Sequence, residues 1–294
     1  MRILIYGQRV AEKQLPYIQD LLLTIDEEEM ECLVHTPYLE KLNAHVKVPA
    51  RAKAFDGTDA DFAANNIDFV ISLGGDGTIL SAVTMIKDRQ LPVLGINMGR
   101  LGFLASIENT FASQAIQMLA RGMYTIEERT MIYLETDEKI FAGQRFALND
   151  FTLHKRDTSS MITIHTYING DFLTSYWADG LIVSTPTGST GYSLSCGGPI
   201  VFPNSGNFII TPVAPHNLNV RPIVISDTSV ISFEIEGRSS NYLCTLDSRS
   251  EVVTSDHQLA VRKCDFKTRL VLLDNFSFLK TIHEKLTWGK DSRN

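Results

Sequence analysis

Residues 67–73, IDFVISL, are mostly apolar and run directly into the glycine-rich stretch GGDGT at 74–78. A nearly continuous apolar run is typical of a strand that is buried on both faces, as in a parallel sheet covered by helices. Glycines that follow such a strand let the backbone turn sharply and approach a ligand closely. The feature therefore predicts an α/β domain with a binding loop at the end of an internal strand.

The chain up to about residue 125 alternates strand and helix patterns. The strand patterns cover residues 2–6, 67–73 and 92–97, and the helical patterns cover 10–25, 78–88 and 109–122. This alternation favours a parallel sheet with crossover helices. We therefore expect residues 1–125 to form an α/β domain that carries the glycine-rich loop.

Residues 126–273 have a different character, because short β-rich runs follow one another with turn residues between them. The runs lie at 131–136, 145–154, 161–168, 180–185, 207–213, 222–225, 229–235, 241–246, 258–263 and 269–274. No helix of normal length fits between them, which predicts an all-β domain of two packed sheets. In the tail, 274–294, Phe278, Ile282 and Leu286 share one helical face. We expect this helix, with Trp288, to pack back on the first domain.

Composition narrows the classes of protein. The 294 residues suffice for about two domains, and the net charge of −7 comes with no basic stripe, which argues against nucleic-acid binding. No stretch reaches the ~20 apolar residues of a membrane helix. The four cysteines lack metal-ligand spacing, which predicts reduced thiols in a cytoplasmic protein. They are Cys32, Cys196, Cys244 and Cys264.

The glycine-rich loop has the elements of an anion site. Exposed backbone N–H groups, followed by a helix that we expect to begin near Thr78, suit a phosphate. Asp76 would repel a phosphate, so its carboxylate needs another role, either as a general base or as a ligand of a metal between phosphates. The alternative is a tight turn in which Asp76 caps the helix. The stretch matches neither the Walker A pattern nor G-x-G-x-x-G.

Two further stretches are rich in polar groups. Residues 179–199 follow a strand with a loop of Thr, Ser, Gly and Pro that contains Tyr192, which suits ribose hydroxyls, phosphate oxygens and an adenine ring. The alternative is a solvent loop of turn formers. Asn149 and Asp150 offer a donor and acceptors for paired sugar hydroxyls, although such a pair is often only a turn. His154, His165 and His283 are expected to be solvated or turn histidines.

Taken together, these stretches resemble the NAD kinase family, whose members transfer a phosphate from a nucleoside triphosphate to the 2′-hydroxyl of the adenosine ribose of NAD. The resemblance runs from about residue 67 to 289. The GGDGT loop alone also occurs in phosphofructokinases and diacylglycerol-type lipid kinases, whereas the block 179–200 is specific. The matching segments are 74–78, GINMGRLGFL at 95–104, LND at 148–150, 179–200, 212–225 and 279–289.

The resemblance implies roles for individual residues. Asp76 is the implied catalytic base. The implied NAD-binding residues are Asp76, Gly77, Phe103, Asn149, Asp150, Asp179, Thr187, Thr190, Gly191, Tyr192, Ser193, Leu194, Ser195, Ala214 and Arg249. The implied ATP phosphate-binding residues are Gly74, Gly75, Gly77 and Thr78. A divalent ion, expected to be Mg²⁺, would bridge the phosphates, with no protein ligand assigned. Family members are homodimers or homotetramers, and Ala214 would contact a neighbouring subunit's NAD.

Four positions depart from the family pattern. Asp150 stands where Glu is usual, Trp177 where some relatives have a basic residue, and Gly191 where Ala is frequent. Arg249 stands where Gln is common, and it would either pair with a phosphate or cap the surface. Two other functions stay open, a lipid kinase with the same loop and a non-catalytic nucleotide-binding protein. The phosphate donor, whether ATP, another triphosphate or polyphosphate, is also open.

Overall fold

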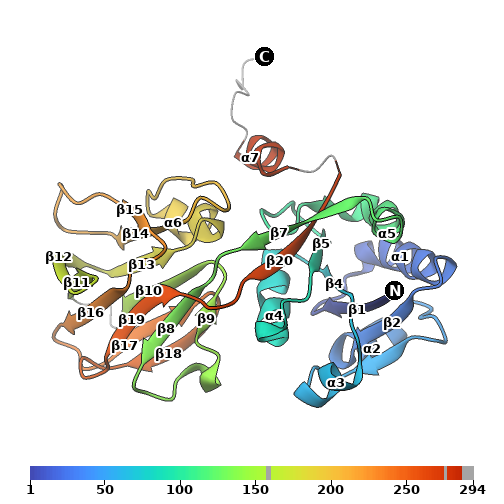
Figure 1. The fold of residues 1–294 in the computed structure, drawn as a ribbon, viewed down its shortest axis with the longest axis horizontal. Helices are drawn as coiled ribbons and strands as arrows, with labels where there is room; N and C mark the ends of the chain where they lie inside the picture. The colour runs from blue at the N-terminus through green and yellow to red at the C-terminus, as the bar shows by residue number, and fades with distance from the viewer. Residues whose placement is uncertain (157–159, 275–276, 287–294) are drawn as a thin grey trace. The chain divides into compact units, whose positions relative to one another are not determined.

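In the computed structural model, residues 1–156, 160–274 and 277–286 are described. The chain divides into two compact domains (Figure 1). The first domain combines Met1–Glu127 with the chain from Arg269 onward, and the second is Glu128–Thr268. Among the described residues, no helix is long and apolar enough to cross a membrane.

The first domain contains a mainly parallel sheet in the order β3-β2-β1-β4-β5-β20-β7, with β6 beside β5. Strand β4 is buried at all five positions, as expected for an internal strand with both faces covered. The strands are β1 (Arg2–Gly7), β2 (Glu31–His35), β3 (Lys53–Phe55), β4 (Phe69–Leu73), β5 (Val93–Asn97), β6 (Ile107–Glu108), β7 (Tyr124–Arg129) and β20 (Thr268–Leu273).

Helices cover this sheet and supply its apolar cores. Ile18 and Leu22 of α1 and Ile116 of α5 join Ile5 and Ile71 of the sheet in one buried cluster. Helix α4 packs instead on β1, β4 and β5 through its own buried residues. The helices are α1 (Leu15–Glu27), α2 (Thr36–Asn43), α3 (Asp59–Ala64), α4 (Asp76–Ile86), α5 (Ala112–Ala120) and α7 (Phe278–Leu286).

Strand β20 corrects the expected assignment of residues 269–274 to the all-β domain. It pairs in parallel with β5, and Val271 and Leu273 enter the apolar cluster of the first domain. The physical reason lies in its sequence, because LVLL is apolar at every position, as in a strand buried on both faces. The last strand of the chain therefore completes the first sheet.

The second domain consists of two antiparallel six-stranded sheets with one apolar core between them. One sheet has the order β15-β14-β13-β10-β17-β18 and the other β12-β11-β16-β19-β8-β9. The first sheet comprises β10 (Asp150–Lys155), β13 (Gly180–Ser184), β14 (Asn207–Val213), β15 (Ile223–Ser226), β17 (Tyr242–Leu246) and β18 (Arg249–Val253). The second comprises β8 (Ile132–Thr136), β9 (Phe146–Ala147), β11 (Ile162–Ile168), β12 (Asp171–Ala178), β16 (Ile231–Glu236) and β19 (Leu259–Lys263).

Only short helical turns interrupt the described part of this domain. The 3₁₀ turns are η4 (Phe141–Gly143) and η5 (Thr187–Thr190), and the single α-helical turn is α6 (Tyr192–Ser195). The fold class expected from the sequence, an α/β domain followed by an all-β domain, is therefore confirmed.

Helix α7 belongs to the first domain. Its Ile282 is buried, and the Nζ atom of Lys285 lies 5.2 Å from the centre of the Phe103 ring. The C-terminal helix therefore returns to the α/β domain, as the apolar face of the tail predicts. Trp288 lies outside the described residues.

Candidate functional site

The GGDGT loop joins the end of β4 to the start of α4. Gly75 is the N-cap residue of α4, and the helix begins at Asp76, two residues earlier than expected. A Cβ atom at Gly74 would lie 2.1 Å from the Thr78 hydroxyl oxygen, so this position requires glycine. Around Gly77, by contrast, no atom other than its chain neighbours and the helix backbone lies within 4 Å of where a Cβ would be, which leaves space for a ligand there.

The carboxylate of Asp76 is held by three consecutive backbone amides. Its Oδ2 atom accepts a hydrogen bond from Phe103 (2.9 Å), and its Oδ1 atom accepts from Leu104 (3.1 Å) and Ala105 (2.9 Å). The Asp76 side chain therefore does not cap its own helix, which rules out the N-cap alternative. A carboxylate oxygen can accept two hydrogen bonds, so Oδ2 can accept one more from a substrate hydroxyl.

A cavity of about 330 Å³ adjoins the glycine loop in the first domain. Besides loop residues, Arg9, Asn97 and Arg100 line it, and none of its lining residues is acidic. Asn97 braces this side of the cavity, since its Oδ1 accepts a hydrogen bond from Gly99 (2.6 Å). The sequence does not identify Arg9 or Arg100 as site residues, although Arg100 lies in the GINMGRLGFL segment.

In the second domain, residues 148–150 lie against the loop after β13. The Thr185 hydroxyl donates to the Leu148 carbonyl (2.6 Å), and the Thr185 amide donates to the Asn149 carbonyl (2.9 Å). A Cβ atom at Gly188 would lie 2.2 Å from that Asn149 carbonyl oxygen. Two segments expected to bind NAD are thus packed on each other. The Oδ1 atom of Asn149 is buried without a hydrogen-bond partner.

The loop 187–195 presents some of its expected residues and buries others. Tyr192 is 41% exposed, and its ring stacks on His154 with 5.6 Å between ring centres. The Ser193 hydroxyl is instead buried against the Thr211 hydroxyl at 2.8 Å, which gives it a structural role. His154 is half-buried, and burial lowers its pKa.

Turn contacts shape the rest of this loop. The Thr190 hydroxyl donates to the Thr187 carbonyl (3.3 Å), and the Gly191 amide donates to the Gly188 carbonyl (2.8 Å). The Thr187 hydroxyl accepts from the buried Arg129 (3.3 Å). Leu194 is half-buried, while the Ser195 residue beside it is exposed.

Three of the singled-out residues lie at the ends of β12 and β14. Trp177 is near the end of β12, Asp179 directly follows β12, and Ala214 directly follows β14. The Asp179 carboxylate pairs with the Lys155 ammonium at 2.6 Å, and the Asp179 amide donates to the Val213 carbonyl. Ala214 is exposed at a φ of 45° directly after β14. Trp177 is 46% exposed and lies 4.2 Å from the His216 ring, measured between ring centres.

Arg249 makes contacts inside its own domain. Its guanidinium donates to the carbonyls of Gln144 (2.6 Å) and Phe146, and it lies 5.4 Å from the centre of the Phe146 ring. The Arg249 guanidinium is thus bound to backbone carbonyls of its own domain.

The environment of the Asp150 carboxyl shifts its pKa well above the usual value. Its side chain is buried, which, with the nearby charge of Asp247, raises the pKa of Asp150 to about 7. A carboxyl with this pKa is partly protonated at neutral pH, so it can donate as well as accept a hydrogen bond. Asp150, whose side chain is one methylene shorter than that of the usual Glu, therefore has a buried carboxyl.

Replacing Asp150 by asparagine is expected to remove a pH-dependent part of the stability. The folded pKa of about 7 exceeds the ordinary value of 3.8, so the folded state holds its proton over this range while the unfolded state releases it. Stability therefore falls as pH rises from about 4 to 7, by an amount on the order of 4 kcal/mol at full effect. Urea unfolding at pH 5 and pH 8 checks this. The advantage of D150N over wild type should grow at pH 8, and an unchanged difference would contradict the assignment.

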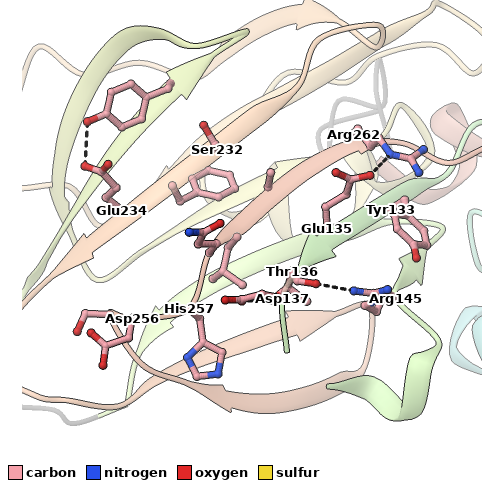
Figure 2. A pocket seen from close by; sticks show the side chains of 16 residues that line it. Tyr133, Glu135, Thr136, Asp137, Arg145, Ser232, Glu234, Asp256, His257 and Arg262 are labelled. Atoms are coloured by element: carbon pink, nitrogen blue, oxygen red, sulfur yellow. Dashed lines mark hydrogen bonds and ion pairs between the residues drawn. The ribbon is translucent and has the colours of Figure 1, made fainter. Parts of the chain in front are cut away.

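A cavity of about 680 Å³ lies elsewhere in the second domain (Figure 2). It opens on β8, β11, β16 and β19, in the sheet that does not contain residues 148–150 or 180–184. Glu135 pairs there with Arg262 at 2.6 Å, and the Tyr167 hydroxyl donates to Glu234. None of the expected site residues lines it.

Two family models and two similar proteins that match this chain are described as NAD kinases. The family model described as ATP-NAD kinase N-terminal domain matches residues 24–124, and the one described as ATP-NAD kinase C-terminal domain matches 148–273. An NAD kinase from Cytophaga hutchinsonii is 50% identical, with 99% of each chain covered. One from Flavobacterium johnsoniae is 43% identical over the full length of both chains.

Solved structures give the same result. Yeast NADH kinase complexed with NADH matches with a TM-score of 0.86 and 26% identity, over 99% of this chain and 89% of that one. An NAD kinase from Archaeoglobus fulgidus in complex with ATP matches in fold, with a TM-score of 0.74 and 23% identity over 98% and 99% of the two chains. The glycine-loop carboxylate, the two-domain fold and these full-length matches lead to one conclusion: the chain belongs to the NAD kinase family.

Proposed function

We propose that this member of the NAD kinase family transfers the terminal phosphate of ATP to the 2′-hydroxyl of the adenosine ribose of NAD, with Asp76 as the general base. The observation that carries the proposal is the Asp76 carboxylate, which three backbone amides fix at the start of α4. Its Oδ2 atom can still accept a hydrogen bond, as a base that receives a hydroxyl proton requires.

Residues of the second domain would bind NAD, the phosphate acceptor. The buried, unpartnered Oδ1 of Asn149 would accept a hydrogen bond from the nucleotide, beside Asp150. Tyr192 offers an exposed ring for stacking. Burial raises the pKa of Tyr192, and the charges of Asp150 and Asp179 act in the same direction, which supports a common neighbourhood for these three residues. Phe103 and Gly77 are further proposed NAD contacts.

The donor side uses the cavity at the glycine loop. The open backbone of Gly75 and Gly77 and the N-terminus of α4 would hold the phosphates, with Arg9 and Arg100 as counter-charges. Mg²⁺ would enter as the MgATP substrate, bound to the phosphates. Most of its ligands would then be phosphate oxygens and water, as is usual for Mg²⁺.

The proposed reaction is a direct transfer. Asp76 accepts the proton of the ribose 2′-hydroxyl while the 2′-oxygen forms a bond to the γ-phosphorus. The bond between that phosphorus and the bridging oxygen of ADP breaks, and ADP leaves. The products are NADP and ADP, and the proton on Asp76 passes to solvent. The protein contributes through positioning and through the charges around the phosphates.

Purified protein incubated with NAD, MgATP and buffer should form NADP and ADP in equal amounts. Replacing NAD with a diacylglycerol tests the lipid kinase, and binding of NAD without turnover would indicate a nucleotide-binding protein. The similar yeast NADH kinase is complexed with NADH in its crystal structure, so NADH should be included as a second acceptor. Failure to form NADP with any triphosphate or polyphosphate donor would overturn the proposal.

Replacing Arg100 by alanine is expected to raise the KM for MgATP by about two- to tenfold, the loss of one exposed charge-assisted contact. The KM for NAD should change little. Arg51→Ala is the matched control, because Arg51 is an exposed arginine of the same domain that pairs with Asp26 (2.8 Å). If wild type and the Arg100 variant have the same KM for MgATP, Arg100 does not bind the phosphate donor.

The proposal includes a homodimer or homotetramer in the cytoplasm. The exposed loop after β14, with Ala214 at a positive φ, is the segment that would reach a neighbouring subunit's NAD. Three cysteines are buried, and burial raises the pKa of the Cys32 thiol to about 12, which fits unreactive reduced thiols. Size-exclusion chromatography with light scattering measures the assembly.

A further inference from the structure

The turn between β17 and β18 places a carboxylate against the expected NAD-binding segment. Asp247 accepts hydrogen bonds from three consecutive backbone amides, those of Leu148 (3.0 Å), Asn149 (2.7 Å) and Asp150 (3.3 Å). The Asp247 amide in turn donates to the Asp150 carbonyl at 3.0 Å. One residue of the turn thus fixes the whole segment 148–150.

The carboxylate acts where the strand pairing ends. Strands β10 and β17 pair up to Phe151 opposite Leu246, and the chain of β17 then turns away. Without a partner, the amides that precede Phe151 would lack the hydrogen bonds that buried backbone requires. Asp247 has a φ of 53°, a conformation that Asp tolerates better than most residues. Its carboxylate accepts the hydrogen bonds that a neighbouring strand would otherwise accept.

The other side of the segment is also fixed. Thr185 donates to the carbonyls of Leu148 and Asn149, and Gly188 packs directly on the Asn149 backbone. Residues 148–150 therefore lie between the Asp247 turn and the loop that leads to 187–195. The Asn149 side chain takes its direction from a backbone that is held on both sides.

Charged groups around Asp247 support this arrangement. Burial raises the pKa of Asp247, while the three amides and the charge of Arg249 act in the opposite direction. Arg249 itself holds the carbonyls of Gln144 and Phe146, just before the segment. The turn 247–249 thus binds the amides of one stretch and the carbonyls of the stretch before it.

We propose that Asp247 is a positioning residue for the dinucleotide: it orients the Asn149 side chain toward NAD by holding the amides of residues 148–150, without touching the substrate. The inference rests on the proposed function, since it takes the Asn149–Asp150 segment as part of the NAD site. It adds a residue that the chain needs for NAD affinity and that lies outside the NAD-binding set.

Steady-state kinetics of the full-length Asp247→Ala and Asp247→Asn variants tests the proposal. The alanine variant should raise the KM for NAD by about ten- to hundredfold, the loss expected for hydrogen bonds to a charged group. Asparagine keeps an oxygen that can accept from Asn149 and Asp150, so D247N should recover part of the affinity. The KM for MgATP should stay within about twofold of wild type, since the donor contacts are not involved.

Asp227→Asn is the matched control. Asp227 is a buried carboxylate of the same domain, 4% exposed, which pairs with Lys263 (2.6 Å). Its replacement should lower the melting temperature without raising the KM for NAD selectively. If D247N changes stability alone, as D227N does, or raises both KM values equally, Asp247 is merely structural and the inference is wrong.

Asn149→Ala separates this inference from the proposed function. If N149A raises the KM for NAD and the Asp247 variants do not, only the positioning role fails. If N149A also leaves the KM for NAD unchanged, the placement of NAD on this segment fails, and the positioning role fails with it. If D247A does not fold, D247N carries the same comparison.

Discussion

Replacing Asp76 by asparagine is expected to lower the turnover number for NADP formation by about 10²–10⁴-fold, the usual contribution of general-base catalysis. The amide has nearly the same size as the carboxylate, but it cannot take up the proton of the ribose 2′-hydroxyl. The measurement is the turnover number of D76N and wild type at saturating NAD and MgATP.

The fold of D76N should be largely intact. Its amide oxygen can still accept from Leu104 and Ala105, whereas its NH₂ group faces the Phe103 amide, and a lost hydrogen bond of this kind is worth about 1 kcal/mol. Thermal unfolding measures that loss. Asp20→Asn, an exposed carboxylate on α1, is the charge-matched control and should keep full turnover. If D76N retained more than about a tenth of the turnover, Asp76 would not be the base.

Replacing Gly102 by alanine should reduce turnover by about 10²-fold without removing any reacting group. A Cβ atom there would lie 1.9 Å from the Asp76 Oδ1 atom, so either the carboxylate or the loop that holds it must move. A displacement of about 1 Å at a catalytic group can lower the rate by about 10²-fold. Turnover and melting temperature, measured together, separate this effect from unfolding.

Gly99→Ala is the matched control in the same loop. A Cβ atom at Gly99 would have as its nearest neighbour the Asn97 side-chain oxygen, at 3.8 Å, which is an ordinary contact. Neither Gly99 nor Gly102 has a positive φ, so both variants add a methyl group without backbone strain. Equal turnover in G99A and G102A would show that the contact between Gly102 and Asp76 has no catalytic consequence.

Local patterns explain which parts of the fold could be predicted. Strand β4 and the turn after it form from adjacent residues, an apolar run followed directly by glycines. The sequence alone therefore predicts both. Strand β20 has a similar apolar run, LVLL, but its partner β5 lies far away in the sequence. Pairing between such distant segments has no local signal, so the sequence alone places this strand in the neighbouring β domain.

The same distinction applies to the site. The types and spacing of Asp76 and Asn149 could be recognised, but not the groups that hold them. Asp76 binds amides 27–29 residues away, and Asp247 binds amides 97–99 residues away. Nearly every residue has a backbone amide, so the residue types in the sequence do not reveal which amides bind a side chain. Arg249 could be identified as unusual, whereas its carbonyl partners could not.

A crystal structure of the protein with NAD bound tests the central claim most directly. We expect the 2′-oxygen of the adenosine ribose to lie within hydrogen-bonding distance, about 2.6–3.2 Å, of the Asp76 carboxylate. The Asn149 side chain should contact the same dinucleotide. A complex in which NAD occupies residues 148–150 while its 2′-oxygen faces another side chain would contradict the account.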